Sequence, residues 1–296
     1  MKTIKSVILQ YLDHEDDSQE KYQTVLDILN KEKIQENKHL MIALFRLITK
    51  IANNHYHGPF FYERVDSLII KFKDQIKNQF SNTEIFSIFK SNKRILLLLI
   101  EEKIMIIDKS IIDKFLTEKY SMADYHNYFQ PEIESFIKNN AEEGDNKKIS
   151  FDFKNEKLPD DSSEKRKIGA NDHNICKLIR NDSLDEFIVY INQNNYPISS
   201  LINPSIYETN SLLLKTEIKE INSSSLWKRS IKKRLQKYDL ELIDYAIFFG
   251  AIQILKYLLL NGVNLTKLSW LCAIHSGNAE LFSLLVSFIE RSPTFE

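Results

Sequence analysis

The sequence predicts an all-α fold, a solenoid of antiparallel helix pairs that is regular near the C-terminus and degenerate toward the N-terminus. Three observations lead to this prediction. Apolar residues recur at helical spacing along most of the chain. The 296 residues include only 6 glycines and 6 prolines, few for a fold built on many tight turns. Residues 240–289 contain one unit written twice, and neither copy can bury its apolar face alone.

The repeated unit is defined by three pairs of equivalent positions. A shift of 27 residues places Ala246 on Ala273, Gly250 on Gly277 and Leu258 on Leu285. Alanine adds little bulk, so it would allow neighbouring helices to approach closely. Each glycine would end the first helix of its copy in a left-handed conformation, which glycine adopts at low cost. The leucines lie on the apolar stripe expected to face the core.

The two copies read A-x-x-x-G-x-x-x-I-L-x-x-L-L from Ala246, followed by N-G-V-N, and A-x-x-x-G-x-x-x-L-F-x-x-L-V from Ala273. This pattern resembles the ankyrin repeat. The T-P-L-H opening of that family is replaced by LELIDY and LSWLCA, and the period of 27 is shorter than the usual ~33. A shortened or lost β-hairpin finger is therefore expected.

The chain as a whole is similar to uncharacterised ankyrin-like proteins, with a domain of unknown function, that are expanded in some parasitic protists. This likeness rests on ICKLIRNDSLDEF, NPSIYETN, KKRLQKYDLELIDYAIFFGAIQILKYL and the lysine- and asparagine-rich style. The resemblance implies protein–protein binding and carries over no enzymatic activity.

Two upstream segments fit the repeat less closely. Ile88 and Asn92 occupy the alanine and glycine positions in one, and Ile179 and Ser183 occupy them in the other. Asparagine tolerates the left-handed conformation better than most residues, so Asn92 is a reasonable substitute for glycine. These matches predict degenerate repeats in both halves of the chain.

The predicted organisation is a helical region over residues 1–138 and an ankyrin-like region over residues 173–296. Residues 139–172 are charged, rich in turn-forming residues and poor in aliphatic stripes, so we expect a flexible linker or surface loop there. Asn203-Pro204 fits the start of a helix, and another helix is expected over about residues 223–238.

Composition narrows the classes of partner. The net charge of −1 provides no general attraction for nucleic acid, which makes nucleic acid an unlikely partner. No apolar run approaches the ~20 residues of a membrane helix, so we expect no membrane insertion. Cys176 and Cys272 lie far apart in apolar helical runs, which favours reduced core thiols and an intracellular, cytoplasmic location.

Motifs for catalysis and for cofactor or metal binding are missing from the sequence. It has no phosphate-binding glycine loop, no dinucleotide fingerprint, no H-E-x-x-H and no C-x-x-C. His55 and His57 form the one close histidine pair, and two ligands do not complete a zinc site. We expect no enzyme activity, cofactor or metal, and the oligomeric state stays open.

Three residues near the repeat turns are candidates for contact with a protein partner. Phe249 and Trp270 could serve as aromatic anchors, although packing between repeats would also explain both. His275 lies two residues before Gly277, where it could face a partner or cap the end of its own helix.

One basic segment offers an alternative function. The predicted helix over 223–238 carries six basic residues: Lys228, Arg229, Lys232, Lys233, Arg234 and Lys237. These could bind nucleic acid or phosphate or act as a nuclear-import signal. The simpler interpretation is a solvated helix face balanced by Asp239 and Glu241. The sequence therefore favours a non-catalytic interaction scaffold with an unidentified protein partner.

Overall fold

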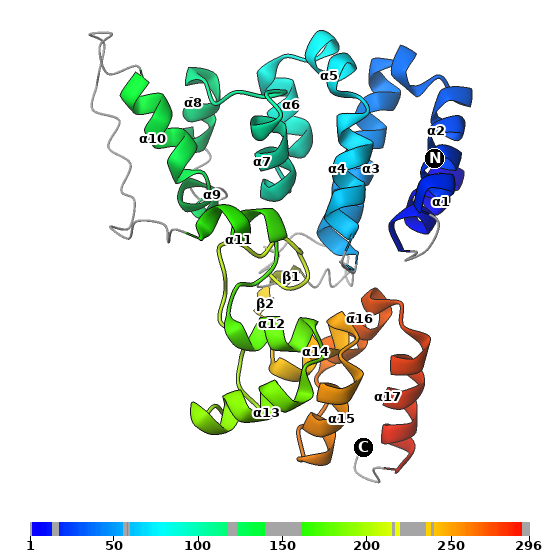
Figure 1. Cartoon of the computed structure of the whole chain (residues 1–296), viewed down its shortest axis with the longest axis vertical. Helices are drawn as coiled ribbons and strands as arrows, with labels where there is room; N and C mark the ends of the chain where they lie inside the picture. The colour runs from blue at the N-terminus through cyan, green and yellow to red at the C-terminus, as the bar shows by residue number, and fades with distance from the viewer. Residues whose placement is uncertain are drawn as a thin grey trace, which may run out of the picture. The chain divides into compact units, whose positions relative to one another are not determined.

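The computed structural model describes residues 2–13, 18–55, 58, 60–117, 123–139, 161–214, 217–219, 235–237 and 240–291. Their secondary structure is helical apart from one short pair of strands and an isolated β-bridge between Leu201 and Glu241, which agrees with the predicted all-α class (Figure 1). The chain divides into two compact units. Unit 1 comprises residues 1–53 and 57–170, and unit 2 comprises residues 54–56 and 171–296.

Unit 1 is a succession of mostly short helices. The last residue of α3 belongs to unit 2. The helices are α1 (Lys2–Asp13), α2 (Ser18–Lys31), η1 (Ile34–Glu36), α3 (Lys38–Asn54), α4 (Phe61–Ile70), α5 (Lys73–Gln79), α6 (Asn82–Phe89), α7 (Lys93–Glu101), α8 (Lys109–Thr117), α9 (Ala123–Tyr128), α10 (Gln130–Asn139) and α11 (Ser162–Ile168).

The core of unit 1 forms around α3, whose apolar residues recur at helical spacing. Phe45 of α3 is fully buried. Its ring centroid lies 5.8 Å from that of Phe72, 6.3 Å from that of Phe80 and 5.4 Å from that of Phe89. Tilted and edge-on arrangements of this kind are the preferred geometries of aromatic pairs. Phe45 therefore joins α3 to helices that follow it in the chain.

The prediction of a linker over residues 139–172 is wrong for Ser162–Ile168, which form α11 of unit 1, and residues 140–160 lie outside the described residues. Arg166 of α11 is buried, and its guanidinium donates to the Glu132 carboxylate at 2.8 and 2.9 Å. The Tyr128 hydroxyl donates to the Arg166 carbonyl oxygen at 2.8 Å. This helix is held in place by hydrogen bonds of a buried charged residue and not by an aliphatic stripe. The prediction relied on aliphatic stripes and therefore missed it.

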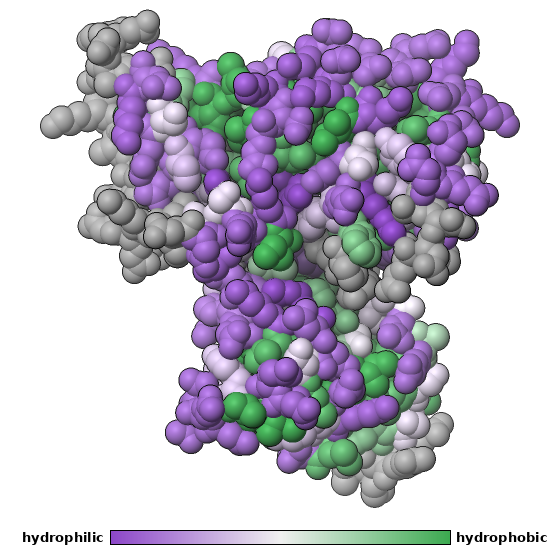
Figure 2. Space-filling view, in the orientation of Figure 1, coloured by the Kyte–Doolittle hydropathy of each residue, from purple (hydrophilic) through white to green (hydrophobic). Residues whose placement is uncertain are grey.

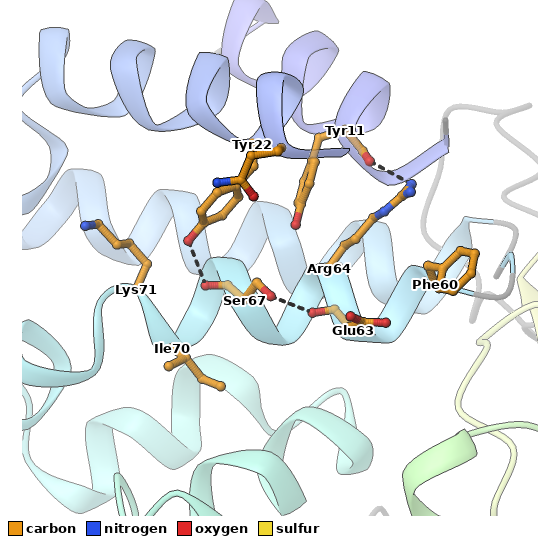
Figure 3. Close-up of a pocket in the computed structure, with 9 residues that line it drawn as sticks. Tyr11, Tyr22, Phe60, Glu63, Arg64, Ser67, Ile70 and Lys71 are labelled. Carbon is orange, nitrogen blue, oxygen red and sulfur yellow. Dashed lines mark hydrogen bonds between the residues drawn. The ribbon is translucent and has the colours of Figure 1, made fainter. Parts of the chain in front are cut away.

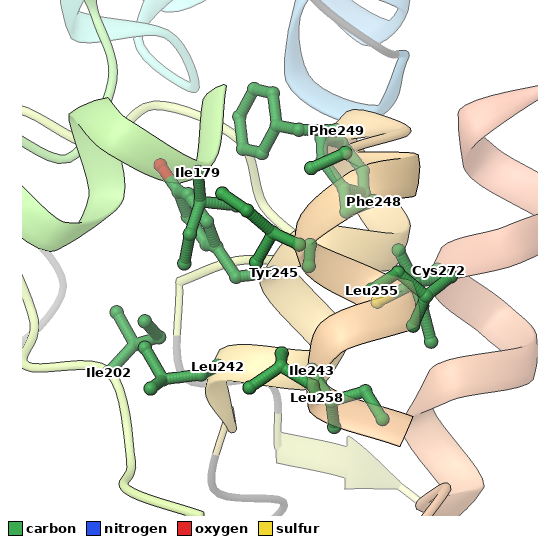
Figure 4. Close-up of a cluster of buried hydrophobic side chains, with 14 of the residues drawn as sticks. Ile179, Ile202, Leu242, Ile243, Tyr245, Phe248, Phe249, Leu255, Leu258 and Cys272 are labelled. Carbon is green, nitrogen blue, oxygen red and sulfur yellow. The ribbon is translucent and has the colours of Figure 1, made fainter. Parts of the chain in front are cut away.

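Unit 2 contains three pairs of helices joined by short turns: α12 (Asn174–Arg180) with α13 (Leu184–Gln193), α14 (Leu242–Phe249) with α15 (Ile252–Leu260), and α16 (Lys267–Ser276) with α17 (Ala279–Arg291). Helix α14 packs against α12, α15 and α16, and all eight of its residues are buried. Figure 4 shows part of this apolar cluster, which includes Ile179, Leu258 and Cys272. Burial raises the pKa of the Cys176 thiol to about 12 and raises that of Cys272 as well.

Residues 201–214 do not form the helix expected at Pro204 and instead follow an irregular path. The buried Glu208 carboxylate accepts backbone N–H groups of Asn171 at 3.1 Å, Thr209 at 2.9 Å and Asn210 at 2.8 Å. Burial raises the pKa of Glu208. A carboxylate that gathers these donors replaces the hydrogen bonds a helix would have supplied.

Strand β1 (Glu217–Lys219) pairs antiparallel with β2 (Leu235–Lys237), with Ile218 opposite Gln236. The predicted helix over 223–238 is therefore wrong at its C-terminal end, where backbone pairing between strands takes the place of helical hydrogen bonds. The rest of that predicted helix lies outside the described residues.

Figure 2 shows one face of the molecule, on which hydrophilic side chains predominate and hydrophobic ones form patches among them. Across the described segments, no helix combines the length and apolarity needed to cross a bilayer.

Candidate functional site

The turns between paired helices in unit 2 repeat one backbone geometry. Gly250 and Gly277 have φ values of 67° and 64°, the left-handed conformation expected from the sequence. After Gly250, the Ala251 N–H donates to the Ala246 carbonyl oxygen at 2.9 Å, which closes the end of α14. Both Ala246 and Ala273 are buried.

The turn between α12 and α13 has the same geometry in a different register from the predicted one. Asp182, and not Ser183, takes the left-handed position with φ 48°. The Ser183 N–H donates to the Leu178 carbonyl oxygen at 3.0 Å, just as Ala251 donates to Ala246. The α12–α13 pair therefore aligns with the α14–α15 pair at a shift of 68 residues, one more than the shift that the apolar pattern suggested.

Asp182 also connects one helix pair to the next. Its carboxylate accepts the backbone N–H groups of Gln253 at 2.9 Å and Ile254 at 3.0 Å, in the first turn of α15. These N–H groups have no partner within their own helix, and the positive end of the helix dipole favours a carboxylate there. A glycine in the same turn could not make this contact.

The left-handed backbone predicted for Asn92 is wrong. Asn92 has φ −131° and caps α7, where its side-chain oxygen accepts the Ile95 N–H at 2.9 Å. Its amide nitrogen donates to the Asn53 side chain at 2.8 Å. A buried asparagine with partners on both ends of its amide is better satisfied as a helix cap than as a substitute for glycine.

The structure does not gather the three predicted partner-contact residues into one exposed site. Phe249 is 6% exposed, and its ring centroid lies 4.6 Å from that of Tyr245, so it is a core residue. Trp270 is half-buried and packs edge-on against Phe282. His275 does not cap its own helix, because its Nδ1 donates to the Asn54 carbonyl oxygen at 2.8 Å.

The predicted basic patch lies largely beyond what the structure describes. Lys228, Arg229, Lys232, Lys233 and Arg234 fall outside the described residues, and Lys237 belongs to β2. Among the described residues, no cluster of three or more histidine, cysteine, aspartate or glutamate side chains is positioned to hold a metal ion.

A concave groove in unit 1 has the residue types of a protein-binding site, although the sequence analysis did not select it (Figure 3). It has a volume of about 620 Å³ and lies between α1, α2 and α4. Its lining consists of Tyr11, Gln19, Tyr22, Phe60, Glu63, Arg64, Ser67, Ile70 and Lys71.

Arg64 and Tyr11 form the buried part of the groove. The Arg64 guanidinium donates to the carbonyl oxygens of Tyr11 at 3.0 Å and Leu12 at 3.1 Å, near the end of α1. A cation is stabilised there because terminal helix carbonyls lack partners and the helix dipole is negative. The guanidinium carbon also lies 5.7 Å from the Tyr11 ring centroid and 5.8 Å from that of Phe60.

The two tyrosines are held together on the wall of the groove. Their ring centroids are 5.4 Å apart, and the Tyr22 hydroxyl points to the Ser67 carbonyl oxygen at 3.4 Å. Burial is the largest cause of a raised pKa at both Tyr11 and Tyr22. Tyrosine hydroxyls are protonated at neutral pH in any case, and that of Tyr22 is already directed to Ser67.

Exposed residues complete the rim of the groove. Phe60 is 51% exposed and Ile70 is 37% exposed, while Glu63 and Lys71 bring charges of opposite sign. Tyrosine and arginine are enriched where proteins bind one another, and aromatic rings give a large contact area with few rotatable bonds. These residues can hold an apolar side chain between polar partners. Because they come from three helices, no short sequence motif reveals them.

The protein was compared with family models, with curated proteins and with solved structures, and no match was found in any of the three.

Proposed function

We propose that this protein is a non-catalytic protein-interaction scaffold and that the groove of unit 1 binds a short segment of a partner protein. One observation carries the proposal: the groove combines a fixed floor with an exposed aromatic rim. The floor is Arg64, hydrogen-bonded to the end of α1, and the rim is Phe60. A floor fixed by packing and hydrogen bonds lowers the entropic cost of binding. The partner segment would present an apolar side chain to Phe60 and Ile70, flanked by charges for Glu63 and Lys71.

The helix pairs of unit 2 support the scaffold class. Three turns share a left-handed residue, two of them also share one backbone hydrogen bond, and α12, α14 and α16 pack in sequence order. We interpret these pairs as ankyrin-like repeats of an antiparallel helical solenoid, with Asp182, Gly250 and Gly277 in equivalent positions. Repeats of this kind present surfaces that can vary without disturbing the core.

The alternative of nucleic-acid or phosphate binding stays a prediction. Its basic residues lie outside the described segments apart from Lys237. The proposal for the groove does not depend on them.

Site-specific photo-crosslinking tests the proposed function. A photoreactive phenylalanine replaces Phe60 in one form of the chain, and Ile168, which is 52% exposed on another helix of unit 1, in the control. We expect a saturable protein adduct from position 60 that excess unmodified chain suppresses. The Phe60→Asp chain should compete poorly. An adduct that does not saturate, or that forms equally from both positions, would overturn the proposal.

A further inference from the structure

The last helix pair of unit 2 carries a surface that we call the end face, made of the half-buried Trp270 and the exposed Ile274 on α16, and of the exposed Phe282 and Val286 on α17. Ile274 is 69% exposed, Phe282 44% and Val286 37%. The ring centroids of Trp270 and Phe282 lie 6.0 Å apart, so the two helices contribute to one continuous surface.

The 27-residue repeat shows what a surface of this kind packs against. The end-face positions correspond, in order, to Ile243, Ile247, Leu255 and Leu259. All four of these residues are buried. Helix α14 packs against α16, and the Ser269 hydroxyl donates to the Asp244 carboxylate across that contact at 2.6 Å. The end face therefore repeats the apolar positions that the preceding helix pair buries.

The first helix pair of unit 2 has charged side chains at positions where the last pair is buried, although Val189 is also exposed on it. In the register that the turns define, the buried Cys272 and Leu281 correspond to Lys177 of α12 and Glu186 of α13. Both of these charged residues are exposed. A terminal repeat needs such a polar face in order to remain soluble. The two ends of the described stack therefore differ, because the first carries exposed charges at these positions and the last carries exposed apolar side chains.

We infer that the end face binds the end face of a second copy of this chain and forms a closed two-fold dimer. In a two-fold arrangement each copy offers the same residues, so apolar side chains meet apolar side chains and leave water together. A head-to-tail arrangement would press Lys177 and Glu186 against Ile274 and Phe282. Burying those charges among apolar side chains would be unfavourable.

Sedimentation velocity on the full chain tests the dimer. Wild type should show a concentration-dependent species of twice 34.9 kDa. Phe282→Glu should weaken dimerisation at least about 100-fold, because the interface would contain two buried unpaired carboxylates. Val189→Glu is the matched control, since Val189 is 52% exposed on α13. A wild-type monomer at every concentration, or equal weakening by both variants, would overturn the inference.

Cysteine crosslinking tests the two-fold arrangement, and thermal unfolding checks that each variant is folded. Cys176 and Cys272 are buried, so an introduced thiol is the accessible one among the described residues. Ile274→Cys alone should give a crosslinked dimer with a short bismaleimide. A product that requires mixing Ile274→Cys with Val189→Cys would show head-to-tail contact and contradict the inference. Phe60→Asp should dimerise like wild type, which separates this surface from the proposed groove.

Discussion

Asp182 combines two requirements that different residues meet elsewhere in unit 2. It adopts the left-handed backbone of the turn, and its carboxylate caps α15. Asp182→Asn should cost well under 1 kcal/mol, because asparagine tolerates this backbone and keeps one acceptor. Asp182→Ala should cost about 1–2 kcal/mol, because it loses the cap and strains the turn. Urea unfolding measures both values, and equal losses would contradict the capping role.

Glu84 should make stability depend on pH in the acid range. Hydrogen bonds from Lys38, chiefly, and from Ser81 lower the pKa of this carboxyl from 4.5 to about 2. Because the folded-state pKa is depressed, the stabilising contribution is fully present above pH 4.5 and is lost as the pH falls through 2. The free energies of unfolding of wild type and Glu84→Gln should therefore converge on acidification. A difference that stays constant from pH 6 to pH 2.5 would show that the ionised carboxylate contributes nothing.

At the scale of the helix pair, two glycines allow a matched comparison. Gly250 and Gly277 share a left-handed backbone, but an added Cβ at Gly250 would meet the Asn278 amide at 3.3 Å, whereas no atom lies within 4 Å at Gly277. Each change to alanine should cost about 1 kcal/mol of backbone strain. Gly250→Ala should cost more, because Asn278 caps α17 and has to shift. Chemical denaturation of both variants checks this order. A larger loss of stability at Gly277 would contradict the predicted clash between residue 250 and Asn278.

Periodicity and glycine placement carried most of the correct structural predictions. The helices, the positions of Gly250 and Gly277 and the burial of Leu258 and Leu285 follow from apolar spacing and from backbone chemistry that is local in sequence. The register at Asp182 could not be obtained in this way. Its left-handed backbone is stabilised by contact with α15, about 70 residues later in the chain.

Predictions that depended on tertiary contacts were wrong or incomplete. Helix α11 is held by a buried ion pair, between Arg166 and Glu132, that composition does not distinguish from a solvated linker. The same reason applies to the candidate site. The groove needs Tyr11, Tyr22 and Arg64 to meet from three helices, and sequence spacing gives no sign that they do. Phe249 illustrates the converse, since an aromatic residue beside a turn proved to be core.

At the scale of the whole molecule, limited proteolysis should cut first in the sequence of unit 1 that separates α10 from α11. The composition of residues 140–160 still predicts an accessible segment, with trypsin sites at Lys147, Lys148, Lys154 and Lys157. Lys165 and Lys167 lie in α11, and cleavage there requires that helix to open locally. Peptide mapping of early digests should therefore show cuts within residues 140–160 and none in α11. First cleavage at Lys165 or Lys167 would contradict the packing of α11 in unit 1.

The most direct test of the scaffold proposal is the affinity of the crosslinked partner for matched variants of the chain. Phe60→Asp should weaken binding at least about tenfold, because an aromatic anchor of an interface contributes on the order of 2 kcal/mol. Ile168→Asp, at an equally exposed apolar position, and Phe282→Glu, on the end face, should bind within about twofold of wild type. A dissociation constant for Phe60→Asp that matches those of wild type and Ile168→Asp would contradict a role for the groove.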